Sequence, residues 1–195
     1  MKRLWAPWRM EYILDENKHN SCLFCDISNG NSKKSTADRK NLILDRGKHC
    51  FVLMNKYPYN NGHLMVVPYF HTSSFDGLSD DVLFEFIKTV NKSVDNLKKA
   101  LNPDGFNLGL NFGKVAGAGM ESHMHFHIVP RWTGDTDSMP IIAETRVMPE
   151  HLKKTYNHLR KIFSKNSFSS RSPSQIIHNF YLYSKYIHVL PAFCK

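Results

Sequence analysis

The chain has 195 residues, of which 42% are hydrophobic, with a formal charge of +9 and a pI of about 9.4. This length suits one domain, or one domain with an appendage, and the hydrophobic content can fill one core. No apolar run is long enough to cross a bilayer, and the charged N-terminus lacks the apolar stretch of a signal peptide, so we predict a cytoplasmic protein. The positive charge favours anionic partners, although the scattered basic residues also fit a plain solvated surface.

The first half of the chain predicts short strands joined by turns. Residues 1–20 follow no regular pattern, and residues 29–35 predict a polar loop. Apolar runs separated by turn residues predict strands at 41–45, 50–55 and 63–68. The first two strands form a hairpin, and Pro68 closes the third.

Two of the four cysteines are close in sequence, as Cys22-Leu23-Phe24-Cys25, whereas Cys50 and Cys194 lie far from them. So sparse a set does not predict a disulfide framework. The pair indicates a metal site or a redox pair, and two reduced core cysteines are the alternative.

The second half predicts two amphipathic helices and two strands. Apolar residues recur at helical spacing over 79–101, where Ser79 or Asp80 can cap the start and Asn102-Pro103-Asp104-Gly105 ends the helix. Strands are expected at 106–112 and 122–129, and a second helix at 149–163 with Pro149 in its first turn. Strands joined mostly by short turns predict an antiparallel sheet and the α+β class.

The tail differs in composition from the rest of the chain. Residues 164–174 are rich in serine and predict a linker, while 176–190 are aromatic and apolar. We therefore divide the chain into a domain over 1–163 and a linker with an aromatic tail over 164–195. That tail could dock on the domain or on a second subunit, or have no role.

The strongest chemical signal is the run His123-Met124-His125-Phe126-His127. Successive side chains of a strand point to opposite faces, so the three histidines are expected to share one face, about 6.6–6.8 Å apart. The apolar residues between them would pack on the core, and the histidines would face a cavity or solvent. Histidines that merely satisfy a surface strand are the structural alternative.

Two chemistries compete for these histidines. They could bind one metal, but three collinear positions span too far for a single tetrahedral ion. Alternatively, the middle histidine is a nucleophile toward phosphorus, because a neutral imidazole attacks well near pH 7 and is a workable leaving group afterwards. The glycine-rich run over 113–119 favours the second reading, since it can bring backbone N–H groups to a phosphate, although it could also be only a flexible loop.

The sequence resembles the histidine triad (HIT) family, whose motif of three histidines alternating with apolar residues is complete at 123–129. Further stretches resemble the bacterial branch of the same family. They are Leu4-Trp5-Ala6-Pro7-Trp8-Arg9, the Cys22–Cys25 pair, Asn55-Lys56-Tyr57-Pro58, residues 62–68 and Pro130-Arg131-Trp132. The resemblance covers about residues 1–163. It implies an antiparallel five-stranded sheet with a long helix and a C-terminal helix, usually in a homodimer.

The resemblance also implies a mechanism and a set of substrate contacts. His125 would become nucleotidylated by attacking the α-phosphorus of a nucleotide, and water or phosphate would release the product. His127 would contact phosphoryl oxygen, Asn55 would bind ribose, and Asn111 would help to hold phosphate together with the backbone at Gly119.

Some members of the family hold a structural zinc ion, and the matching positions here are Cys22, Cys25, His71 and His123. Two thiolates and two imidazoles suit closed tetrahedral zinc. This would give His123 a task separate from catalysis. His63 would have a structural or outer-shell role.

Several functions remain open at this point. A polar residue that many family hydrolases carry shortly before the triad is replaced here by Gly119 and Met120, where Ser122 or backbone groups could substitute. The glycine-rich loop and the Pro-Arg-Trp-x-Gly-Asp run resemble the branch described as diadenosine tetraphosphate phosphorylases. We therefore expect cleavage of dinucleoside polyphosphates. The alternatives are a purine nucleoside phosphoramidase and a non-catalytic nucleotide- or partner-binding module; the lack of a basic cluster argues against a nucleic-acid partner.

Overall fold

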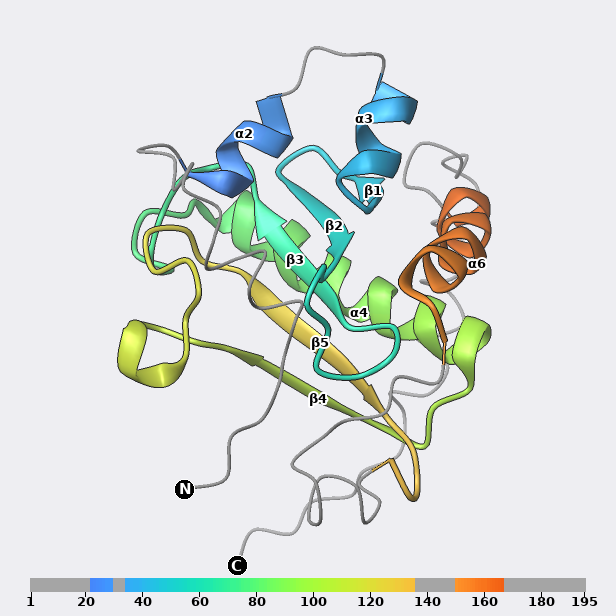
Figure 1. The fold of residues 1–195 in the computed structure, drawn as a ribbon. Helices are drawn as coiled ribbons and strands as arrows, with labels where there is room; N and C mark the ends of the chain where they lie inside the picture. The colour runs from blue at the N-terminus through green and yellow to red at the C-terminus, as the bar shows by residue number, and fades with distance from the viewer. Residues whose placement is uncertain (1–21, 30–33, 136–149, 167–195) are drawn as a thin grey trace, which may run out of the picture.

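The structure is a computed structural model that describes residues 22–29, 34–135 and 150–166. Its centre is a five-stranded antiparallel sheet with strand order β1-β2-β3-β5-β4 (Figure 1). The strands are β1 (Ile43–Arg46), β2 (Cys50–Met54), β3 (Leu64–Pro68), β4 (Gly105–Leu110) and β5 (Phe126–Arg131). The helices are α2 (Leu23–Asn29), α3 (Lys34–Lys40), α4 (Asp80–Leu101) and α6 (Leu152–Lys165), with a 3-10 turn, η1 (Lys114–Ala116). The predicted α+β class and antiparallel sheet are confirmed.

The sheet is covered on both faces, which is why β2 and β3 read as continuous apolar runs. Alternate residues such as Val52 and Val66 pack with α4 and α6 in the larger core cluster. Their neighbours Phe51 and Met65 pack on the other face with Phe24 of α2. Because Met65 lies opposite His127 in the β3–β5 register, the histidine face of β5 is the α2 side.

The long helix is close to its prediction. It begins at Asp80, after Ser79 in extended conformation, and ends at Leu101. The next residue, Asn102, has a φ of 45°, in the left-handed region that stops helices. Ser79 makes no side-chain capping bond. The acidic residues Asp80 and Asp81 in the first turn stabilise the N-terminus of the helix through its dipole.

The second predicted helix is displaced. It begins at Leu152, with His151 as its N-cap accepting from the Lys153 N–H, and it continues to Lys165. The helix therefore extends two residues beyond the predicted end of the domain at 163. Pro149 lies outside the described residues.

Two short helices were not predicted. The proposed polar loop over 29–35 is wrong at its end, because α3 begins at Lys34. Seven-residue helices such as α2 and α3 are too short to show a clear helical period in sequence. Predictions for residues 1–20 and for the tail beyond 166 lie outside the described residues. Within the described part of the chain, no helix combines the length and apolar character needed to cross a membrane.

Candidate active site

Most of the histidine run precedes β5 and is not part of a strand. Only His127 belongs to β5, because pairing with both neighbouring strands stops at Phe126. Before that residue, the Met124 N–H donates to the Thr72 carbonyl at 2.7 Å. The prediction of a strand from Ser122 is wrong, but the alternation persists: Met124, Phe126 and Ile128 all pack in the α4 core, as expected.

The three histidines are buried, so the alternative that they face solvent is wrong. Their exposed fractions are 0%, 6% and 8% for His123, His125 and His127. The Phe24 ring of α2 covers the first two, with centroid distances of 5.4 and 5.1 Å. Burial lowers the pKa of all three, that of His127 to about 4, so each imidazole is neutral at pH 7.

The hydrogen bond of His125 decides which of its nitrogens can react. Its Nδ1 lies 2.9 Å from the His123 carbonyl oxygen. A carbonyl can only accept, so we assign the proton of the neutral ring to Nδ1. Nε2 then carries a lone pair, which is the form a nucleophile needs.

His127 is oriented by His63, for which the sequence predicted a structural or outer-shell role. The Tyr59 N–H donates to His63 Nδ1 at 3.0 Å, which leaves the proton of His63 on Nε2. That Nε2–H lies 2.9 Å from His127 Nδ1 and donates to it. His127 therefore carries its own proton on Nε2. The signal for His63 was its place after the Gly62 turn, beside the triad strand.

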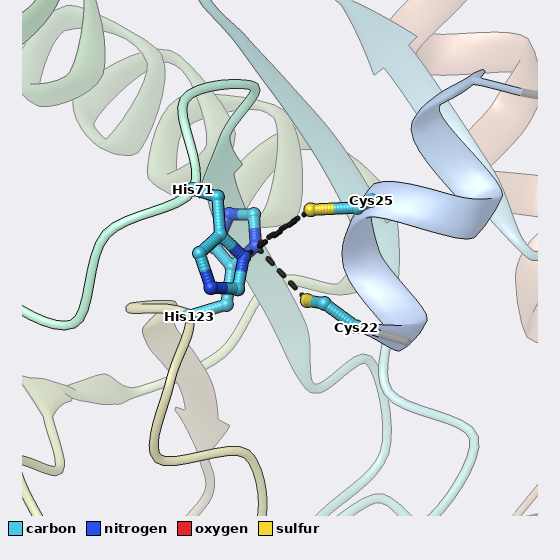
Figure 2. A group of neighbouring side chains, drawn as sticks. All are labelled: Cys22, Cys25, His71 and His123. Carbon is cyan, nitrogen blue, oxygen red and sulfur yellow. Dashed lines mark hydrogen bonds between the residues drawn. The ribbon is translucent and has the colours of Figure 1, made fainter. Parts of the chain in front are cut away.

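The four predicted metal ligands come together from three separate segments (Figure 2). Cys22 and Cys25 lie at the start of α2, His71 follows β3, and His123 precedes β5. Their ligand atoms all lie within 4.8 Å of one another. His123 Nδ1 is 3.2 Å from Cys22 Sγ and 3.6 Å from Cys25 Sγ, and His71 Nδ1 is 3.3 Å from Cys25 Sγ.

These distances fit a tetrahedral ion. With Zn–S near 2.3 Å and Zn–N near 2.0–2.1 Å, one zinc ion holds a sulfur and a nitrogen ligand about 3.5 Å apart. His123 Nε2 lies 2.9 Å from the Pro68 carbonyl and donates to it, so its Nδ1 lone pair faces the sulfurs. Burial, followed by the nearby Cys22, raises the pKa of Cys25 to about 11, so a cation is needed to hold this thiol as a thiolate. The cysteines of the described residues are free, and no disulfide forms between Cys22 and Cys25.

Comparison with known proteins decides the family. The family model of the HIT domain matches residues 37–134. The chain is also 37% identical over 163 residues to AP-4-A phosphorylase from Mycobacterium tuberculosis, covering 80% of each protein. The chain belongs to the HIT family.

Solved structures of other HIT proteins have the same fold. A hypothetical histidine triad nucleotide-binding protein from Sulfolobus tokodaii strain 7 is 29% identical, with a TM-score of 0.56 over 74% of this chain and 90% of that one. A Zn-bound histidine triad family protein from Mycobacterium smegmatis is 23% identical, with a TM-score of 0.57 over 74% of this chain and 94% of that one.

The glycine-rich loop of this HIT chain lies between β4 and the triad. Gly113 and Gly117 have φ values of 78° and 88°, a left-handed conformation that favours glycine. A Cβ at Gly117 would lie 3.7 Å from the Asn111 amide nitrogen, so the predicted phosphate contact Asn111 lies against this loop. A Cβ at Gly119 would meet nothing within 4 Å, which leaves open space beside this backbone. The Ser122 hydroxyl points to the Met120 sulfur at 3.6 Å.

The predicted ribose contact, Asn55, lies in the loop between β2 and β3. Its side-chain oxygen accepts from the Tyr57 N–H at 2.9 Å, and its Nδ2 is 3.4 Å from His63 Nδ1. Asn55 therefore lies at the far end of the His127–His63 chain and helps to shape its own loop.

The Pro-Arg-Trp-Thr-Gly-Asp run is hydrogen-bonded to the same β2–β3 loop. The Asp135 carboxylate accepts from Arg131 at 2.6 and 2.7 Å, from the Trp132 N–H at 3.1 Å and from the Asn60 amide at 2.8 Å. Asn60 also donates to the Pro130 carbonyl. The run thus fixes the β2–β3 loop to the end of β5.

Proposed function

We propose that this HIT protein cleaves dinucleoside polyphosphates of the diadenosine tetraphosphate type through a covalent nucleotidyl-His125 intermediate. The observation that carries the proposal is the hydrogen bond from His125 Nδ1 to the His123 carbonyl, which leaves Nε2 as a lone pair. The similarity to AP-4-A phosphorylase supports the substrate class. This similarity also favours inorganic phosphate as the acceptor of the nucleotidyl group, and water is the alternative acceptor.

The reaction has two steps. His125 Nε2 attacks the α-phosphorus that is attached to one adenosine, the bond from that phosphorus to the bridging oxygen breaks, and ATP leaves. A phosphate oxygen then attacks the same phosphorus, the P–N bond breaks, and ADP leaves while His125 regains its lone pair. The His123 carbonyl stabilises the positive charge that the ring carries while it is nucleotidylated.

His127 is the proposed electrostatic partner of His125. Its Nε2–H can donate to a phosphoryl oxygen, and the His63 contact keeps that proton on Nε2. We propose that Asn55 binds ribose, and that Asn111 and the backbone at Gly119 hold phosphate beside the open space of the loop.

Cys22, Cys25, His71 and His123 are proposed to hold a structural zinc ion. The support is the S–N spacing of the cluster and the hydrogen bond that turns His123 Nδ1 toward the sulfurs. Zinc would supply a structural crosslink between the three segments that carry these ligands. It would fix the His123 backbone, whose carbonyl oxygen holds His125.

We also propose a homodimer. β4 is an edge strand, and Leu108 on it and Phe112 after it are 49% and 47% exposed. α4 exposes Phe84 and Ile87 at 64% and 56%. Among the described strands β4 pairs only with β5, and such an edge with apolar residues favours pairing with a second copy; a monomeric mass in solution light scattering would count against it. A cytoplasmic location is part of the proposal, since the free thiols of Cys22, Cys25 and Cys50 suit a reducing compartment.

The test is a product analysis of purified protein with diadenosine tetraphosphate, with and without inorganic phosphate. ADP and ATP that form only with phosphate identify a phosphorylase, which is a nucleotidyltransferase. AMP and ATP without phosphate identify a hydrolase. Absence of cleavage in both, together with turnover of adenosine phosphoramidate, would replace the proposal with the phosphoramidase alternative.

A further inference from the structure

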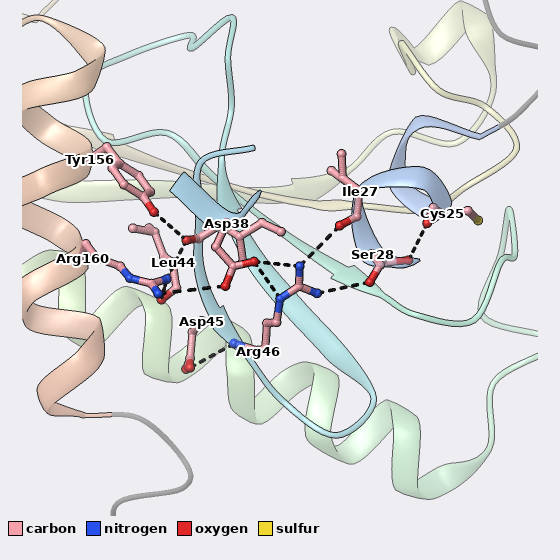
Figure 3. A network of polar contacts seen from close by, with 10 residues as sticks. Cys25, Ile27, Ser28, Asp38, Leu44, Asp45, Arg46, Tyr156 and Arg160 are labelled. Carbon is pink, nitrogen blue, oxygen red and sulfur yellow. Dashed lines mark hydrogen bonds and ion pairs between the residues drawn. The ribbon is translucent and has the colours of Figure 1, made fainter. Parts of the chain in front are cut away.

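An arginine from the sheet binds the C-terminal end of α2, the helix that begins directly after Cys22 and contains Cys25. The Arg46 guanidinium, on β1, donates from Nη2 to the Ile27 carbonyl at 3.3 Å and from Nη1 to the Ser28 carbonyl at 3.5 Å (Figure 3). These carbonyls belong to the last turn of α2, where helix carbonyls lack partners within the helix. A cation there also matches the negative end of the helix dipole.

The same guanidinium is anchored by a buried carboxylate. Asp38 of α3 is 5% exposed, and its Oδ1 accepts from Arg46 Nε at 3.0 Å and from Nη2 at 2.8 Å. Its other oxygen lies 4.0 Å from Arg160 of α6, which itself donates to the Ile43 and Leu44 carbonyls. Arg46 is therefore held by Asp38 of α3 while it holds α2.

One of the residues that Arg46 binds, Ser28, is hydrogen-bonded to the proposed metal ligand Cys25. The Ser28 hydroxyl donates to the Cys25 carbonyl at 2.8 Å, so the residue whose carbonyl Arg46 binds is also bonded to Cys25. Beneath α2, the Arg46 guanidinium lies 5.9 Å from the centroid of Phe51, in the cluster that buries Phe24. Arg46 and Phe24 thus fix the two ends of a helix only seven residues long.

We propose that Arg46, anchored by Asp38, is a positioning residue that sets the place of α2 and with it the metal affinity of Cys22 and Cys25. This inference rests on the proposed zinc site. Without the planar fork of Arg46, α2 can shift relative to His71 and His123, which are fixed to other segments. The metal then meets ligands that are less well placed.

The experiment measures the zinc Kd of the full chain by competition with a chromophoric chelator, beside the thermal unfolding of each variant. Arg46→Lys keeps a charge for Asp38 but cannot bridge the carboxylate and two carbonyls. We expect a loss of zinc affinity of about tenfold to a hundredfold. Arg160→Lys is the matched control, because it touches the same Asp38 and the sheet but makes no contact with α2 in the described structure; its zinc Kd stays as in the wild type. Asp38→Asn leaves the Arg46 carbonyl contacts in place and gives an intermediate loss.

The outcomes separate this inference from the zinc proposal. Wild-type protein that binds no zinc, or binds it as well after Cys25→Ser, contradicts the metal site itself. If wild type binds zinc, an unchanged Kd in Arg46→Lys overturns the positioning role. Equal losses in Arg46→Lys and Arg160→Lys, or failure of both Arg46→Lys and Asp38→Asn to fold, assign the network to general stability and overturn it as well. Cobalt absorption that changes in Arg46→Lys but not in Arg160→Lys supports displaced ligands.

Discussion

The two ends of the histidine run are held by opposite kinds of contact. At one end, His123 donates to a backbone carbonyl and turns its Nδ1 lone pair toward two sulfurs. At the other end, His127 accepts on Nδ1 from His63 and keeps its own proton on Nε2. His125 lies between them and takes its tautomer from the His123 carbonyl. His123 and His127 therefore carry their proton on Nε2, whereas His125 carries it on Nδ1, and the partners of the two outer histidines lie more than fifty residues away in sequence.

Because the contacts differ, we expect substitutions at the two ends of the histidine run to have different effects on stability and on reaction rate. Damage at the metal end acts through the place of the His123 backbone and should change both stability and rate. Damage at the His63 end should change the rate more than the stability, because it alters the direction of one hydrogen bond. Removal of the central residue should change the rate alone.

The largest effect is expected for His125→Ala. The nucleophile is lost, so kcat for diadenosine tetraphosphate should fall by about three orders of magnitude or more. Zinc content and unfolding temperature should stay close to those of the wild type. Residual turnover within tenfold of the wild type, in a preparation free of contaminating activity, would remove His125 from the mechanism.

Cys25→Ala breaks the metal end. If the site is occupied at about a thousand times its Kd, loss of zinc lowers the free energy of unfolding by about 4 kcal/mol, or about 10 °C in Tm. Cys50→Ala is the control, because Cys50 is buried beside Thr89 in the α4 core cluster and not in the cluster of α2. Zinc content measured by atomic emission should fall in the first variant and not in the second. Equal zinc content in both variants would contradict the proposed ligands.

His63→Leu breaks the other end. It removes the donor to His127 Nδ1, so we expect kcat to fall by about tenfold to a hundredfold, at the low end of what proton positioning contributes. His63→Gln retains an amide N–H that can donate to the same nitrogen, and it should keep more activity than Leu. The two kcat values are compared at saturating substrate. A Gln variant as slow as Leu would argue against the assigned hydrogen bond.

The last prediction concerns acid stability. Burial, followed by the neighbouring His127 and His125, lowers the pKa of His63 to about 3, and burial lowers that of His127 to about 4. Below pH 6.5 the unfolded chain takes up protons on these histidines while the folded chain does not. The free energy of unfolding should therefore fall as the pH drops from about 6.5 to about 4, by at most about 1.4 kcal/mol per pH unit for each histidine.

Urea unfolding of wild type and His63→Leu over this range checks the sign and the size. The variant has one fewer buried histidine, so its stability should fall less steeply with acid. Metal release at low pH affects both proteins and cancels in the difference between their slopes. Identical slopes would show that His63 does not titrate as assigned.

The sequence was sufficient to predict the elements whose hydrophobic pattern is long or unambiguous. The 22 residues of α4 and the fully apolar strands β2 and β3 carry a strong pattern, and each was predicted to within two residues. The short helix α2 was missed because its buried face is little more than Phe24 and its neighbours. Yet this helix presents both cysteines, so the gathering of the metal cluster could be predicted only through the family resemblance.

The site was predictable in identity but not in arrangement. The triad and the cysteine pair are visible as residue types at a fixed spacing. The partners that fix each ring are backbone groups, namely the carbonyls of Pro68 and His123 and the N–H of Tyr59. Backbone groups are present at every position, so no sequence pattern shows which of them a histidine meets. Burial of the histidine face also depends on the placement of α2, which lies about 100 residues earlier in the chain.

The most direct test of the central claim is to trap the intermediate. Protein is mixed with diadenosine tetraphosphate without phosphate, quenched in alkaline denaturant, and digested for mass spectrometry. We predict one adenylyl group on His125, which disappears with release of ADP when phosphate is added before the quench, and which His125→Ala never forms. Turnover without any adduct, or an adenylyl group on His127 instead, would contradict the account.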